Sequence, residues 1–165
     1  MAALRDEAEA LAIALTIGAV DVDEVIEWAD AHIAALIAPH WALCEVATSR
    51  GQYPIDVAAR LRELPGRADL AVSRRLVIAL MARKLARDPS RANQFAVALY
   101  HMALAGEIDA PELERLAWWA WDALDLAASG MIEETPDQIV ASMTEALDQA
   151  LAEAPPQWSE HWTPH

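Results

Sequence analysis

The sequence of 165 residues has little of what disulfide, zinc and membrane proteins require. Its single cysteine, Cys44, excludes an internal disulfide and a cysteine-rich zinc site. The apolar helix positions around Cys44 predict an inert, buried thiol. No apolar run approaches the roughly 18 residues that are needed to span a bilayer. The first nine residues carry three acids and lack the basic and apolar regions of a signal peptide. We therefore expect a cytoplasmic protein that has no membrane partner.

The chain also lacks the motifs of common catalytic and cofactor chemistry. It has no glycine-rich phosphate loop, and its five histidines form neither an HExxH nor an ExxH pattern. His161 and His165 have i, i+4 spacing, but they lie in a proline-bearing segment that gives little support for a metal site. Ser49 and Ser73 have no nucleophile-elbow or triad context. We expect no metal, no cofactor and no enzymatic activity.

Negative charge dominates the chain, but it is unevenly spread. The net charge is −14, and residues 1–49 and 92–165 together carry 22 acids and two bases. This excess argues against binding to nucleic acid or to an anionic membrane surface and favours a basic protein partner. Residues 50–91 are basic, and we expect their side chains to pair with the acidic flanks of the same molecule. The bases concerned are Arg60, Arg62, Arg67, Arg74, Arg75, Arg83, Lys84, Arg87 and Arg91.

What is abundant is helix-forming sequence. Alanine is frequent, and the sequences Asp21-Val22-Asp23-Glu24 and Thr135-Pro136-Asp137-Gln138 have the pattern of capping boxes. Each of the five glycines follows a periodic segment, where a helix end favours a residue that tolerates positive φ. Helices are therefore expected at 3–17, from 21 to the proline at 39, at 40–48, 54–64 and 69–87, after a cap at Ser90, from 109 or 110 to 129, and from 135 to the prolines at 155 and 156.

These elements predict an all-α fold. An irregular bundle of about eight helices is the leading architecture, and a HEAT-like stack of helical hairpins is the alternative. We expect a single helical domain over residues 1–154 and an irregular tail over 155–165. The apolar spacing places Leu36 and Ile37 on the inward face of the second helix, and it places Trp28 beside His32 at the border of the core.

The helix expected at 109–129 is the most unusual segment. Residues 116–126 are apolar in almost every direction around the axis, which is typical of a central helix that others surround. Asp122 and Asp125 are then anomalous, because a buried carboxylate needs partners, which Arg74 or Arg75 could supply. We expect at least one of the two to be buried and paired in this way. Two alternatives are an interface with Trp118 and Trp121 and an acid–base centre, although the sequence shows no pocket for the latter.

The tail contributes a second pair of candidate binding residues. Trp158 and Trp162 stand in the irregular segment PPQWSEHWTPH, where they either dock on the body of the protein or form a contact patch. The candidate binding residues are Trp118, Trp121, Asp122, Asp125, Trp158 and Trp162.

A family resemblance is carried by residues 11–33, where a helix, Gly18 and a capping-box turn precede the sequence Val-Ile-x-Trp-Ala-Asp-x-x-Ile at 25–33. Leu-Arg-Glu-Leu-Pro-Gly at 61–66 and Ala-Leu-Tyr at 98–100 fit the same pattern. This pattern resembles small all-helical bacterial immunity proteins of toxin–immunity systems. The resemblance implies a non-enzymatic protein that binds and neutralises one cognate toxin, and it assigns no binding residue.

Three hypotheses about function follow from the sequence. The first is an acidic, helical binding protein of immunity type, whose basic partner is a toxin. The second is a structural or adaptor subunit that self-associates through its tryptophans. The third is an enzyme or small-molecule binder that uses Asp122 and Asp125.

Overall fold

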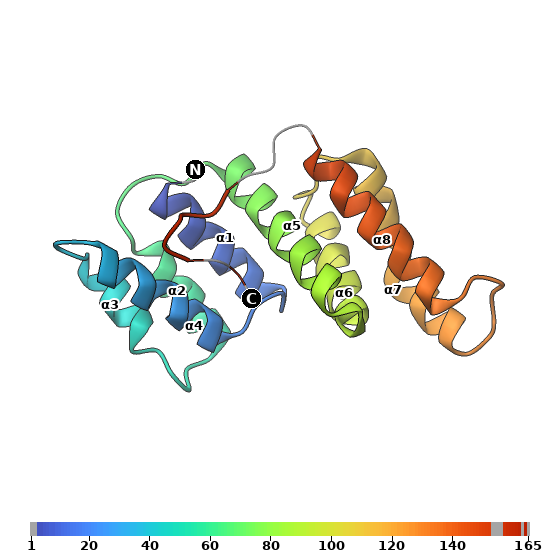
Figure 1. Ribbon diagram of the computed structural model, residues 1–165, viewed down its shortest axis with the longest axis horizontal. Coiled ribbons are helices and arrows are strands. Elements are labelled where there is room, and N and C mark those ends of the chain that lie inside the picture. The colour runs from blue at the N-terminus through green and yellow to red at the C-terminus, as the bar shows by residue number, and fades with distance from the viewer. Residues whose placement is uncertain (1–2, 153–156, 163, 165) are drawn as a thin grey trace. The chain divides into compact units, whose positions relative to one another are not determined.

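The computed structural model describes residues 3–152, 157–162 and 164, and in these residues it contains only helices and irregular segments. The all-α prediction is confirmed (Figure 1). The chain divides by its internal contacts into two compact units. The first holds the described residues up to Val77 and those from 157 onward, and the second runs from Ile78 to the end of the last helix. The division falls within one helix, and the single domain predicted over 1–154 stays a prediction.

Four complete helices build the first unit. They are α1 (Leu4–Thr16), α2 (Val22–Ala35), α3 (Trp41–Ala47) and α4 (Pro54–Arg62). α1 packs on α4, α2 packs on α3, and α3 packs on α4. The helix that crosses the division is α5 (Leu70–Arg87). The second unit adds the 3-10 turn η1 (Pro89–Arg91) and the helices α6 (Ala92–Leu104), α7 (Pro111–Ala128) and α8 (Pro136–Leu151). Within it, α7 packs on both α6 and α8.

The helix boundaries agree with the sequence where the groups that define them lie within a few residues of one another. Asp21 and Thr135 each accept a hydrogen bond from the third residue of the following helix, whose side chain in turn accepts from the cap backbone, so both predicted capping boxes are confirmed. All five glycines have positive φ, as predicted. At the end of α1, Gly18 allows the Ala19 N–H to reach the Ala14 carbonyl at 2.7 Å, which satisfies a terminal acceptor.

Two predicted ends are wrong. α2 stops at Ala35, and its predicted inward residues Leu36 and Ile37 follow the end of the helix, where both are exposed. Ser90 does not cap α6 either. The Asp88 carboxylate accepts from the Ser90 N–H and caps η1, which leads directly into α6.

The surrounded helix is α1 and not α7. Every residue of α1 from Glu7 to Leu15 is buried, including two glutamates. α7 is instead amphipathic, and small residues dominate its inner side, where they allow α6 and α8 to approach closely. The buried residues of α7 are Leu113, Leu116, Ala117, Ala120, Ala123, Leu124 and Ala127. The prediction of a central, fully buried α7 is therefore wrong, and its tryptophans face outward.

Cys44 is exposed, which also corrects the prediction of a buried thiol. The inner side of α3 consists of Ala42, Leu43 and Val46. At 100° per residue, Cys44 lies almost opposite the centre of that side. An apolar neighbourhood in sequence therefore did not place the thiol in the core.

Candidate functional site

α7 presents the four predicted binding residues of the second unit on its exposed side. Trp118 and Trp121 expose 46% and 41% of their surfaces, and Asp122 and Asp125 are exposed as well. The prediction that one of these carboxylates is buried beside an arginine is therefore wrong. The helix that carries them begins with Pro111 at its first position and ends before Gly130, which has positive φ. A single rigid element thus displays two large aromatic side chains and two acids.

Tyr100 of α6 completes an aromatic cluster with these two tryptophans. Its ring centroid lies 5.7 Å from that of Trp118, with the ring planes at 88°, and 5.6 Å from that of Trp121, with the planes at 55°. Both distances and angles suit edge-to-face attraction between aromatic rings. We call Tyr100, Trp118 and Trp121 the aromatic corner. The sequence interpretation missed Tyr100, because it joins the tryptophans only through the packing of α6 on α7. Exposed apolar neighbours lie on either side of it along α6.

Those neighbours extend the corner along α6. Val97 and Leu104 expose 43% and 57% of their surfaces, and they lie one turn before and one turn after Tyr100 on the same side of the helix. We call Val97, Tyr100, Leu104, Trp118 and Trp121 the aromatic face. Exposed apolar residues that gather in this way on a polar surface are typical of protein interaction sites.

Acids flank the aromatic face. Asp122 stands four residues after Trp118, and Asp125 stands four residues after Trp121, so each carboxylate neighbours one indole along the helix surface. Residues 92–152 carry eleven acids and one base. That base, Arg115, donates to Glu112 at 2.6 Å. In the stretch of chain that forms both helices of the aromatic face, acids therefore far outnumber bases.

Trp119 lies on another side of α7. It lines a groove of about 270 Å³ against α8, together with Arg115, Leu116 and Glu145. Trp119 is 42% exposed, which closely matches the exposure of Trp118 and Trp121. It therefore provides a control position for any test of the aromatic face.

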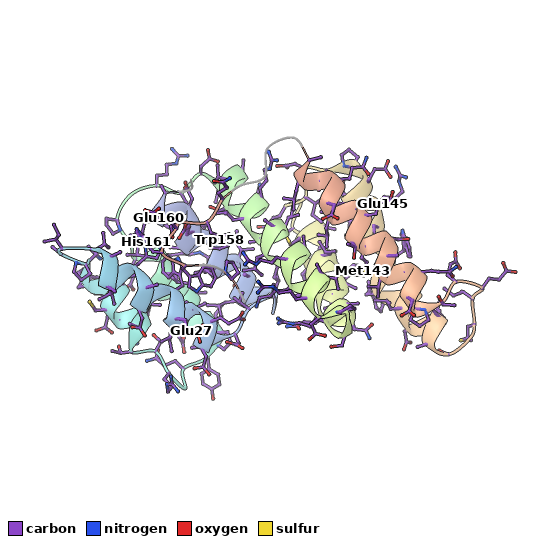
Figure 2. All side chains as sticks on the ribbon, viewed as in Figure 1. Glu27, Met143, Glu145, Trp158, Glu160 and His161 are labelled. Carbon is purple, nitrogen blue, oxygen red and sulfur yellow. The ribbon has the colours of Figure 1, made fainter. Side chains whose placement is uncertain are left out.

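The tail tryptophans dock on the first unit, which is one of the two alternatives that the sequence left open. Trp162 is buried and Trp158 is half-buried, and their ring centroids lie 5.0 Å apart. Figure 2 shows Trp158 and His161 in the tail segment that runs beside α1 and α2. The described tail residues 157–162 have no helix or strand, as predicted, whereas residues 155, 156, 163 and 165 lie outside the described part of the chain.

A buried carboxylate anchors this tail. Glu7 of α1 is fully buried and accepts hydrogen bonds from the indole of Trp28 at 2.8 Å and from the backbone N–H and the hydroxyl of Ser159. It also lies 2.9 Å from Nε2 of His32, whose ring packs 4.9 Å from that of Trp28. The predicted Trp28–His32 neighbourhood is confirmed. Sequence analysis missed Glu7, because its partners lie up to 152 residues away.

The combination of Ser159, His32 and Glu7 does not form a nucleophile relay. A relay requires serine on one imidazole nitrogen and the acid on the other. Here the Ser159 hydroxyl, at 3.1 Å, and the Glu7 carboxylate approach the same Nε2 atom. The arrangement instead satisfies a buried charge with several polar groups, as burial of a charge requires.

Histidines do not assemble a metal site in the described residues, where no group of three potential ligands occurs. The rings of His32 and His161 lie 5.9 Å apart and nearly perpendicular. His165, the other member of the i, i+4 pair, lies outside the described residues.

The basic middle segment pairs with the acidic N-terminal segment through Arg60 and Arg62. Arg62 Nε lies 3.0 Å from Glu9 Oε1, and Arg60 lies 3.2 Å from Glu45. Glu9 also accepts from Arg5 within α1. Farther along the segment, burial and the neighbouring charge of Arg87 lower the pKa of the Arg83 guanidinium below its ordinary value. The expectation of internal pairing is confirmed for Arg60 and Arg62.

Comparisons with profiles of known protein families, with curated proteins and with solved structures give no match for this chain. Among the described helices, none combines the length and the hydropathy that a membrane crossing needs. The resemblance to immunity proteins therefore stays a prediction.

Proposed function

We propose that this chain is a non-enzymatic protein-binding module of immunity type, which captures a basic partner, a cognate toxin, on its aromatic face. The observation that carries the proposal is the exposure of Trp118 and Trp121 beside Tyr100 on two packed helices. Tryptophan, tyrosine and arginine dominate the few residues that supply most of the binding energy in protein interfaces. A tryptophan pair on a rigid helix has this character, because little conformational freedom is lost when it is covered.

The flanking charge supports a basic partner over a second copy of the chain. A two-fold interface places the same patch of both subunits face to face. Two aromatic faces joined in this way would gather the flanking acids of both copies at one interface, and like charges at an interface are costly. A basic protein would instead meet complementary charge, which also accelerates its diffusional encounter. The adaptor hypothesis of self-association is therefore the weaker one.

The setting of the two aspartates also favours binding over catalysis. Acid–base catalysis depends on a positioned group whose proton affinity is tuned by its environment, and a site that excludes water strengthens such effects. Asp122 and Asp125 lie on an exposed helix surface. Carboxylates in that setting guide and orient a partner without requiring a reaction.

The proposal is tested with the product of the gene that neighbours this one, expressed as the candidate toxin. Isothermal titration measures its affinity for the full-length protein and for the double variant Trp118→Ala with Trp121→Ala. We expect the double variant to lose at least about 2 kcal/mol of binding free energy, as hot-spot truncation does. Trp119→Ala is the matched control, because it removes an equally exposed tryptophan from another side of the same helix.

A growth assay adds the functional readout. Co-expression of the wild-type chain should restore growth to cells that express the toxin, and the double variant should not. Equal loss of affinity in Trp119→Ala and in the double variant would contradict the assignment of the site. Sedimentation that shows a dimer for the wild type and a monomer for the double variant would replace the proposal with the adaptor hypothesis.

A further inference from the structure

The aromatic corner has features of a cation site as well as of an apolar contact. Tyr100 stands nearly perpendicular to Trp118 and at 55° to Trp121, so neither indole stacks face to face on the Tyr100 ring. Both indoles remain more than 40% exposed. Exposed faces of aromatic rings carry partial negative charge and attract cations, and tryptophan does so most strongly.

The carboxylates beside the corner strengthen this preference. Asp122 and Asp125 each neighbour one of the two indoles on α7, which places formal negative charge at the edge of the ring cluster. An incoming cation would meet the ring faces and an acid together. A neutral apolar side chain could use only the rings, and an anionic side chain would be repelled.

Two cationic side chains of the second unit contact groups outside the corner. Arg115, the one base between residues 92 and 152, pairs with Glu112 and lines the Trp119 groove. Arg91 lies over the ring of Phe95, with its Cζ 5.0 Å from the ring centroid. That contact is a cation–π pair within the second unit. It uses phenylalanine, which binds cations less strongly than the tryptophans of the corner.

We propose that the aromatic corner recognises the side chain of an arginine in the basic partner. The inference rests on the proposed function and specifies the chemistry of the central contact. Arginine fits better than lysine because its planar guanidinium stacks on aromatic faces while its N–H groups donate to carboxylates in a fork. The guanidinium is also more weakly hydrated than an ammonium, so less solvation is lost when the rings cover it.

Small probes test the recognition without any knowledge of the partner. N-acetyl-arginine amide is titrated into the full-length protein, and N-acetyl-citrulline amide, which has nearly the same shape and no charge, is the matched control. The ¹H–¹⁵N signals of the indole N–H groups report binding at each tryptophan. Single Trp118→Phe, Trp119→Phe and Trp121→Phe variants assign the signals.

We expect the arginine probe to shift the indole signals of Trp118 and Trp121 and to leave that of Trp119 nearly unchanged. The citrulline probe should bind several-fold more weakly. Replacement of Trp118 by leucine, which keeps an apolar side chain and removes the ring, should weaken arginine binding by about two- to fivefold, the range expected for one exposed cation–π contact. Asp122→Asn with Asp125→Asn should weaken it further, with the circular dichroism spectrum unchanged.

Three results would overturn the inference: equal binding of citrulline and arginine, tighter binding of N-acetyl-lysine amide than of arginine, or a Trp119 shift as large as those of Trp118 and Trp121. Its failure is distinguishable from failure of the proposed function. If the toxin binds in a manner that requires Trp118 and Trp121 while the arginine probe does not bind, the function stands and the arginine contact is wrong. If the probe binds as expected and the toxin does not, the proposed function is wrong.

Discussion

The buried carboxylate of Glu7 gives the sharpest stability prediction. In Glu7→Gln the side chain keeps its shape, but one oxygen becomes an NH₂ group that can only donate. The native oxygens accept from the indole of Trp28 on one side and from the Ser159 backbone on the other. Whichever way the amide turns, at least one buried N–H then faces another donor. An unsatisfied buried donor costs about 1–3 kcal/mol, and the surviving bonds lose the strength that a charged acceptor gives them. We expect a total loss of about 2–4 kcal/mol.

Urea unfolding followed by far-ultraviolet circular dichroism measures this loss. Glu134→Gln, an exposed glutamate in the loop before α8, is the control and should stay within about 0.5 kcal/mol of the wild type. Glu7→Gln should also release the tail, because the amide is a weaker acceptor than the carboxylate for the hydrogen bonds that Ser159 donates. The fluorescence of Trp162 should then shift towards that of an exposed indole. A midpoint equal to that of Glu134→Gln would refute the assignment of Glu7 as the anchor of the tail.

Three further predictions follow from exposure and charge. The double variant Asp122→Asn with Asp125→Asn should keep its free energy of unfolding in urea within about 0.5 kcal/mol of the wild type, because both side chains are exposed. A loss of several kcal/mol would instead indicate buried pairing. The exposed thiol of Cys44 should react with Ellman's reagent in the native protein, and a reaction that requires denaturant would contradict its exposure. The association rate with a basic partner should fall as salt rises, because salt screens exposed charges beyond about 8 Å at physiological ionic strength, and a rate that is insensitive to salt would exclude electrostatic steering.

The features that sequence predicted correctly depend on a few adjacent residues. The boxes at Asp21 and Thr135 close within one helical turn, so their patterns contain all the groups that interact. The helix-ending glycines are equally local, because only φ at one residue decides them. Spacing also placed Trp28 beside His32 correctly, since the two lie one turn apart on α2.

Predictions failed where burial depends on distant segments. Nothing near Glu7 in the sequence predicts its burial, which depends on partners that α2 and the tail supply. Glu9 is buried because Arg62, 53 residues away, neutralises it together with Arg5. Apart from Arg5 and Glu9, these partners are too far apart in the sequence to be recognised from a local pattern. For α7 the error was the opposite: full burial was predicted, but only one side of the helix is buried. A stretch that is apolar all round its axis is buried only on the sides that neighbouring helices cover.

The candidate site was likewise predictable only as far as its residues are close together in the sequence. Trp118, Trp121, Asp122 and Asp125 are close in sequence, so one helix was enough to predict that they act together. Tyr100 joins them only because α6 packs on α7, and it changes two exposed indoles into a corner with three ring planes. The acids at its edge have two consequences at once. They oppose the association of two aromatic faces, which exposed tryptophans would otherwise promote, and they favour a cation over any neutral ligand. In the proposed function, one set of carboxylates would thus both limit self-association and select a basic partner.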